Sequence, residues 1–118
     1  MVERISLDAL KKIIHGGIND AATCVVKFYS NRCHYCHDLK PVYENISESF
    51  DDVHFFVFNI EDDKNKEAYS IEGVPTICLV RTGNKTAVKQ LPEPDEPDAT
   101  TWYSEEQIVR FIKKEKLK

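Results

Sequence analysis

The sequence predicts an α/β fold in three layers (α/β/α), with a central mixed sheet of about five strands and four helices. Short apolar runs typical of buried strands alternate with apolar residues at helical spacing along its 118 residues. Such alternation indicates parallel strands joined by crossover helices. A turn at Thr82-Gly83-Asn84 indicates that the last two strands instead form an antiparallel hairpin. A chain of this length builds one core, so we expect a single domain over residues 1–118.

The first half of the chain predicts two strands, each followed by a helix. Residues 2–6 can form a short edge strand, and the helix after it ends at Gly16-Gly17. The apolar run at 22–29 barely alternates with polar residues, which predicts a strand in the centre of the sheet. A helix over about 34–50 follows, and Pro41 inside it removes one backbone hydrogen bond and predicts a kink.

The second half predicts the rest of the sheet and two more helices. We expect strands at 53–60 and 77–80, a hairpin partner at about 86–91, and a weak helix at 64–70. Prolines interleaved with acidic residues over 92–98 exclude a strand or a helix in that loop. The last helix opens with the capping-box pattern Ser104-Glu105-Glu106-Gln107, buries Ile108, Phe111 and Ile112, and ends in lysines that include Lys118.

Composition excludes some classes of function. The formal net charge of −4 gives no basic surface, which argues against a nucleic-acid partner. No stretch approaches the ~20 apolar residues of a membrane span, and residues 1–6 lack the apolar core of a signal peptide. We therefore expect a cytoplasmic protein without a membrane partner. In that reducing compartment, four cysteines do not predict two structural disulfides.

Two cysteines three residues apart, Cys33 and Cys36, stand where the strand at 22–29 gives way to the following helix. Unpaired backbone N–H groups and the positive end of the helix dipole lie at such a helix start, and both stabilise a thiolate. The position therefore predicts a redox-active dithiol, with Cys33 as nucleophile and the more buried Cys36 as resolving cysteine. The side chains expected to tune the thiol pKa are Arg32, His34, Tyr35, His37 and Lys27.

The same residues leave a haem or metal module open as an alternative. Residues 33–37 match the C-x-x-C-H pattern of c-type haem attachment, but the only methionine is Met1, so a His–Met iron is excluded. A zinc or iron–sulfur site would need a second ligand pair, and the sequence has no second CxxC or histidine pair. We predict no metal and no cofactor, and we expect Cys24 and Cys78 to be small buried hydrophobic residues.

Residues 2–91 and the last helix resemble the thioredoxin family. Three features carry the resemblance: the CxxC after a buried strand, Pro41 five residues beyond Cys36, and Val74-Pro75-Thr76 before another strand. The resemblance implies a thioredoxin-like fold and thiol–disulfide exchange with protein substrates, as part of electron transport and cell redox homeostasis. It also implies a monomer that a thioredoxin-reductase-type protein or glutathione supplies with electrons. A cis peptide bond at Val74–Pro75 is expected, with Val74 and Pro75 binding an extended substrate segment.

The sequence departs from the family pattern around the dithiol. Arg32 replaces the usual tryptophan before the first cysteine, and His34-Tyr35 replaces the usual Gly-Pro between the two cysteines. Tyr35 resembles the tyrosine of the glutaredoxin motif Cys-Pro-Tyr-Cys, which keeps glutathione-linked activity open. The acidic loop at 92–98 replaces a short glycine-containing connection, so a thioredoxin-fold binding subunit without redox turnover is a further alternative.

Lys27 is the departure with the most direct bearing on mechanism. It stands six residues before Cys33, where thioredoxins keep a buried acid, and Val57 stands where a lysine often faces that acid. The long side chain of Lys27 can extend its ammonium group to the surface. Alternatively, the amine lies beneath the dithiol, where it would stabilise the Cys33 thiolate and accept the Cys36 proton.

Overall fold

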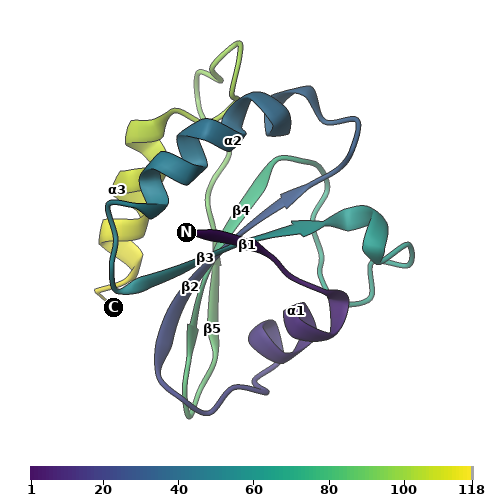
Figure 1. The fold of residues 1–118 in the computed structure, drawn as a ribbon, viewed down its shortest axis with the longest axis vertical. Coiled ribbons are helices and arrows are strands. Elements are labelled where there is room, and N and C mark those ends of the chain that lie inside the picture. The colour runs from purple at the N-terminus through teal and green to yellow at the C-terminus, as the bar shows by residue number, and fades with distance from the viewer. Residues whose placement is uncertain (118) are drawn as a thin grey trace.

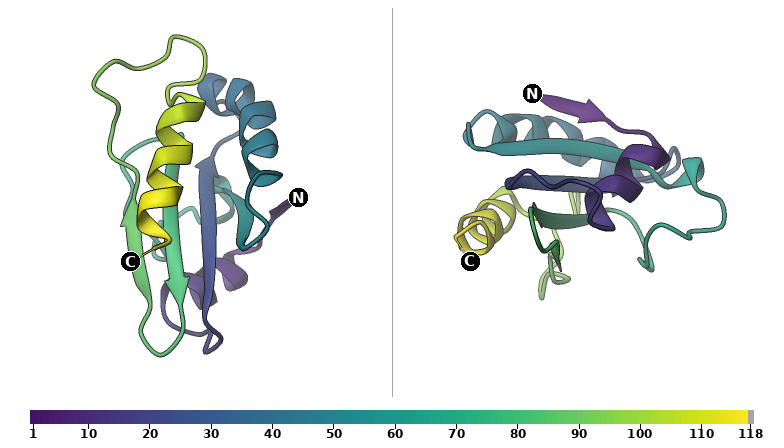
Figure 2. Two further views of the ribbon diagram at one scale, coloured as in Figure 1. Left: turned by 90° about the vertical axis from the view of Figure 1, so that its left-hand side faces the viewer. Right: turned by 90° about the horizontal axis from the view of Figure 1, so that it is seen from below.

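The computed structural model describes residues 1–117, so that Lys118 lies outside the described residues. One five-stranded sheet, in the order β1-β3-β2-β4-β5, separates α2 and α3 on one face from α1 on the other (Figures 1 and 2). The strands are β1 (Val2–Arg4), β2 (Ala22–Tyr29), β3 (Val53–Asn59), β4 (Thr76–Thr82) and β5 (Ala87–Gln90). The helices are α1 (Leu7–Ile14), α2 (His34–Ser47) and α3 (Glu105–Glu115), with a 3-10 turn η1 (Ile60–Asp62). The predicted three-layer α/β/α class is confirmed.

The sheet is mixed because β3 pairs in parallel with both β1 and β2, whereas β4 pairs antiparallel with β2 and β5. The predicted central strand is correct: β2 has a neighbour on each side, and five successive residues from Cys24 to Phe28 are buried. Each face of the sheet carries its own apolar cluster. Leu39, Tyr43, Ile108 and Ile112 belong to the cluster under α2 and α3, and Leu10, Phe28 and Tyr69 belong to the cluster under α1.

The fourth predicted helix, at 64–70, is wrong. Lys66 has a φ of 54°, outside the helical region, and the Asp63 carboxylate accepts a hydrogen bond from the backbone N–H of Ala68 at 3.1 Å. Ala68 and Tyr69 instead insert into the apolar cluster under α1. Burial of these two side chains therefore decides the path of a segment with weak helical propensity. None of the helices among residues 1–117 is long and apolar enough to cross a membrane.

Candidate active site

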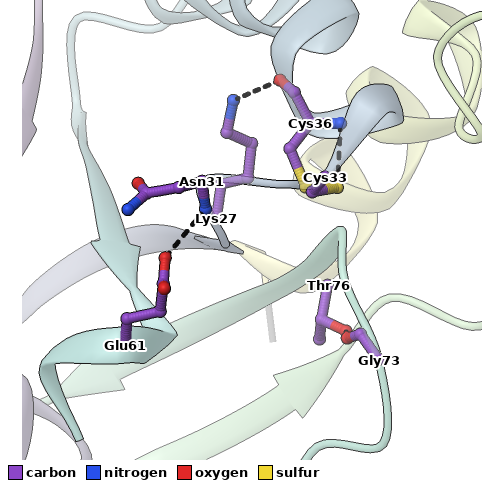
Figure 3. The surroundings of a disulfide bond; sticks show 7 residues. All are labelled: Lys27, Asn31, Cys33, Cys36, Glu61, Gly73 and Thr76. Atoms are coloured by element: carbon purple, nitrogen blue, oxygen red, sulfur yellow. Dashed lines mark hydrogen bonds between the residues drawn. A yellow bond between two sulfur atoms is a disulfide. The ribbon is translucent and has the colours of Figure 1, made fainter.

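A disulfide between Cys33 and Cys36 lies at the junction of β2 and α2, as Figure 3 shows. Cys33 is the N-cap residue of α2, with extended backbone, and its Sγ accepts a hydrogen bond from the backbone N–H of Cys36 at 3.0 Å. Cys36 is buried, with 3% of its surface exposed, whereas Cys33 is half-buried. The chain therefore places a backbone donor and a helix N-terminus at the more accessible sulfur, the arrangement that stabilises a thiolate there.

Lys27 projects from β2 toward the start of α2 and is buried, with 3% of its surface exposed. Its Nζ donates a hydrogen bond to the carbonyl oxygen of Cys36 at 3.4 Å (Figure 3) and lies 5.2 Å from the centroid of the Tyr43 ring. Burial lowers the pKa of Lys27 from 10.5 to about 8; the nearby charge of Lys40 acts in the same direction, while Glu44 opposes it. Of the two interpretations of this lysine, extension to the surface is wrong: the amine is buried at the start of α2, at the carbonyl oxygen of Cys36.

The other side chains expected around the dithiol are more exposed. Arg32, His34 and His37 are exposed at the surface, so any effect they have on Cys33 acts through solvent. Tyr35 is half-buried, because its ring packs edge to face against the ring of Trp102, with 5.4 Å between the ring centroids. Among residues 1–117 there is no group of three or more His, Cys, Asp or Glu side chains placed to hold a metal ion.

Trp102 is a site residue that the sequence patterns did not indicate. It has a φ of 66° and closes the loop through a β-bridge with Asp98, while its indole N–H donates to the Glu93 carboxylate at 2.7 Å. The acidic loop is thereby fixed to Tyr35, between the two cysteines. The one available signal was that this residue, the only tryptophan of the chain, directly follows the loop.

A second set of polar contacts fixes the segment before Cys33. Asn59, buried at the end of β3, donates to the side-chain oxygen of Asn31 at 2.8 Å and accepts from the backbone N–H of Glu61 at 3.0 Å. The Glu61 carboxylate in turn accepts from the backbone N–H of Asn31 at 3.0 Å. The three side chains close a ring of hydrogen bonds that ties the approach to the dithiol to the end of the neighbouring strand.

The Val74–Pro75 turn precedes β4, and its peptide bond is cis. Pro75 is buried and Val74 is half-buried. Thr76 fixes the turn by donating its hydroxyl to the carbonyl oxygen of Gly73 at 2.6 Å. In the view of Figure 3, Gly73 and Thr76, which flank this pair, lie on the opposite side of the disulfide from the Lys27 amine.

The two remaining cysteines lie in the core. Cys24 and Cys78 are free thiols with 5% and 7% of their surfaces exposed. Burial raises the pKa of both, that of Cys78 to about 12, so neither is a thiolate at neutral pH. The prediction that they are small buried hydrophobic residues is confirmed.

The sequence and the fold were compared with known proteins. The thioredoxin family model matches residues 7–101. A thioredoxin of Chlamydia pneumoniae is 31% identical over 88 residues, which cover 74% of this chain and 81% of that protein. Protein disulfide isomerase-like 1-1 of Arabidopsis thaliana is 31% identical over 97 residues, which cover 76% of this chain and 19% of that protein.

Solved structures agree with the fold. Chloroplastic thioredoxin z superimposes with a TM-score of 0.71 at 19% identity, over 99% of this chain and 96% of that chain. At this identity the similarity shows the fold alone. The chain spans about a fifth of the length of the disulfide isomerase relatives it matches, but most of the length of the bacterial thioredoxin.

Proposed function

Because the chain belongs to the thioredoxin family, we propose that it is a thiol–disulfide oxidoreductase that exchanges disulfides with protein substrates. The observation that carries the proposal is the Cys33–Cys36 pair at the start of α2, close enough for a disulfide and with the Cys36 N–H directed at Cys33 Sγ. Similarity to both thioredoxins and disulfide isomerases supports this class of activity.

In the proposed mechanism the Cys33 thiolate attacks one sulfur of a substrate disulfide. The substrate S–S bond breaks, a mixed disulfide forms on Cys33, and the other substrate sulfur leaves as a thiolate that takes up a proton. Cys36 then loses its proton and attacks Cys33 Sγ, which releases the second substrate thiol and leaves the Cys33–Cys36 disulfide. Two electrons thereby pass from the protein to its substrate.

Lys27 is suited to both steps. Its ammonium form, held at the carbonyl oxygen of Cys36, would favour the Cys33 thiolate by charge attraction. With a pKa of about 8, Lys27 is mostly protonated near neutral pH, but a minor fraction is neutral, and this neutral amine can accept the Cys36 proton during resolution. Its contact with the Cys36 carbonyl oxygen keeps it within reach of that residue.

Substrate binding is assigned to the turn before β4. The backbone of Val74 would pair with an extended substrate segment, with buried Pro75 fixing the direction of the turn. Thiolate stabilisation favours the reduced form, so we expect a reduction potential above the thioredoxin value of about −270 mV. We further propose that the protein is a cytoplasmic monomer. Its electron donor would be a thioredoxin-reductase-type protein or glutathione.

Glutathione-linked activity is a second candidate, supported by Tyr35 directly before Cys36. Reduction of insulin by dithiothreitol, followed by turbidity, tests the main proposal. The wild type should accelerate precipitation, whereas Cys33→Ser should not. The Cys36→Ser variant should instead accumulate mixed disulfides on Cys33. If the wild type does not accelerate precipitation and Cys36→Ser accumulates no mixed disulfide, the protein is a binding subunit without redox turnover.

A further inference from the structure

A cleft of about 460 Å³ opens beside the disulfide, between α2 and the side of the sheet formed by β2, β3 and β1. Cys33 and Cys36 both line it. The described residues that line it do not include the Val74–Pro75 turn to which we assign protein substrates. A small molecule in this cleft could therefore reach the disulfide from a different side than an extended protein segment.

The floor of the cleft carries two cations in one row. Lys27 pairs with Val57 across β2 and β3, and Val57 pairs with Arg4 across β3 and β1. Paired residues of neighbouring strands point to the same face, so Lys27 and Arg4 flank the short Val57. The Arg4 guanidinium already pairs with Asp62 at 3.0 Å, whereas no carboxylate among the described residues forms an ion pair with Lys27.

The wall of the cleft is one face of α2. Cys36, Lys40 and Glu44 follow each other at four-residue spacing and so share that face, and all three line the cleft. Lys40 is exposed, and its charge is close enough to Lys27 to disfavour the protonated form of that buried amine. Two ammonium groups therefore face one cleft that has a single lining carboxylate, Glu44, and an anion between them would relieve their repulsion.

We propose that this cleft binds the carboxylate of a low-molecular-weight thiol between Lys27 and Lys40, with its sulfur directed at the Cys33–Cys36 disulfide. The inference rests on the proposed dithiol chemistry and names the reductant that recharges it. The bound thiolate attacks Cys33 Sγ, the Cys33–Cys36 bond breaks, and Cys36 leaves as a thiolate that takes up a proton. A second thiol then attacks the mixed disulfide and releases Cys33 as a thiol. Two small thiols are thereby oxidised to one disulfide as the protein gains two electrons.

The test compares two small thiols that differ in charge. Oxidised protein is mixed with 3-mercaptopropionate or 2-mercaptoethanol, the reaction is quenched with acid, and reduced cysteines are counted by maleimide mass labelling. Each rate is divided by the thiolate concentration to give a rate constant. The readout is the ratio of the rate constant with 3-mercaptopropionate to that with 2-mercaptoethanol, which isolates the effect of the carboxylate. Lys40→Gln and Lys40→Glu are compared with the wild type at low salt. Lys85→Gln is the matched control, because Lys85 is also exposed but lies at the β4–β5 turn, away from the cleft.

We expect the ratio to fall about threefold in Lys40→Gln and about tenfold in Lys40→Glu, and to stay at the wild-type value in Lys85→Gln. Rate constants with 2-mercaptoethanol, whose thiolate carries one negative charge fewer, should fall less than those with 3-mercaptopropionate in the Lys40 variants and should not change in Lys85→Gln. Two results would overturn the cleft assignment. The first is the same ratio of rate constants in all four proteins. The second is an equal fall of the ratio in Lys40→Gln and Lys85→Gln, which would show that the net charge of the protein, and not the cleft, determines the ratio. If the wild type still reduces insulin in that case, only the cleft assignment fails. If neither thiol reduces the disulfide and insulin is not reduced, the proposed function fails as well.

Discussion

Replacing Lys27 by methionine should stabilise the protein at neutral pH. Lys27→Met keeps the length of the side chain in its buried position and removes the ammonium group. The lowering of the Lys27 pKa from 10.5 to about 8 corresponds to about 3.5 kcal/mol of unfavourable burial of the charged form, at about 1.4 kcal/mol for each pKa unit. Loss of the hydrogen bond to the Cys36 carbonyl oxygen and of the contact with the Tyr43 ring offsets about 1.5 kcal/mol of this. We therefore expect a net gain of about 2 kcal/mol in the free energy of unfolding.

The pH dependence has a defined sign. The folded protein holds Lys27 with a pKa lower than in the unfolded chain, so between about pH 8 and about pH 10.5 the unfolded state binds more protons at this residue. The contribution of Lys27 to the free energy of unfolding of the wild type therefore increases with pH across that window. Lys27→Met has no titratable group at this position and lacks this increase. The advantage of the variant is fully present below about pH 8 and should be lost by about pH 10.5.

Urea unfolding of the oxidised proteins at about pH 7 and about pH 10.5 measures this difference. The disulfide prevents Cys33 and Cys36 from titrating. The contributions of the other titratable groups to the free energy of unfolding cancel when the variant is compared with the wild type. Lys40→Met is the control, because it removes an exposed charge from the same cleft. If Lys27→Met is less stable than the wild type at neutral pH, or its advantage is the same at both pH values, the buried ammonium is not the cause.

Further outcomes follow from the same geometry. Lys27→Met should raise the pKa of the Cys33 thiol and shift the reduction potential to a more negative value, by at most about 30 mV for each pKa unit; unchanged values would remove Lys27 from the mechanism. Iodoacetamide at about pH 6–7 should alkylate Cys33 in the reduced protein well before the other three cysteines, and equal labelling of all four would contradict the nucleophile assignment. The fluorescence of Trp102 should change when the disulfide is reduced, because its ring contacts Tyr35 between the two cysteines; a spectrum independent of redox state would refute that link. Asn59→Ala should cost about 1–3 kcal/mol in urea unfolding, because it removes the two hydrogen bonds that the buried Asn59 side chain makes with Asn31 and with the Glu61 N–H; a loss below about 0.5 kcal/mol would contradict this.

The sheet, most of the helices and the position of the dithiol could be predicted because they depend on local patterns. The unbroken apolar run of β2 and the helical spacing that follows it place Cys33 at a helix start without any knowledge of tertiary contacts. The predicted helix at 64–70 failed because its propensity was weak and its outcome depended on a distant contact. Burial of Tyr69 against Phe28 at 5.2 Å between ring centroids is a tertiary contact that local propensity does not contain.

The link between Trp102 and the dithiol could not be predicted, for a related reason. Tyr35 and Trp102 are far apart in the sequence, and their contact requires a positive φ at Trp102, which a large side chain rarely adopts. The sequence indicated that residues 92–98 form an acidic loop, but not the direction in which the loop turns. The hydrogen bond from Trp102 to Glu93 helps to hold that direction, and it exists only once the loop has closed.

The position of the Lys27 amine could not be predicted from the sequence. Its place on a central strand left two positions open for the amine, at the surface or beneath the dithiol, because a lysine side chain is long enough for either. Packing excludes the surface: the Tyr43 ring and the Cys36 carbonyl oxygen hold the buried Nζ at the start of α2, and Val57 is short enough to leave open space beside it. The acid and lysine that the family often pairs at these positions have become a lysine and a valine. This position thus still carries a titratable group, but one of opposite charge, and we propose that it favours the Cys33 thiolate, which a carboxylate there would oppose.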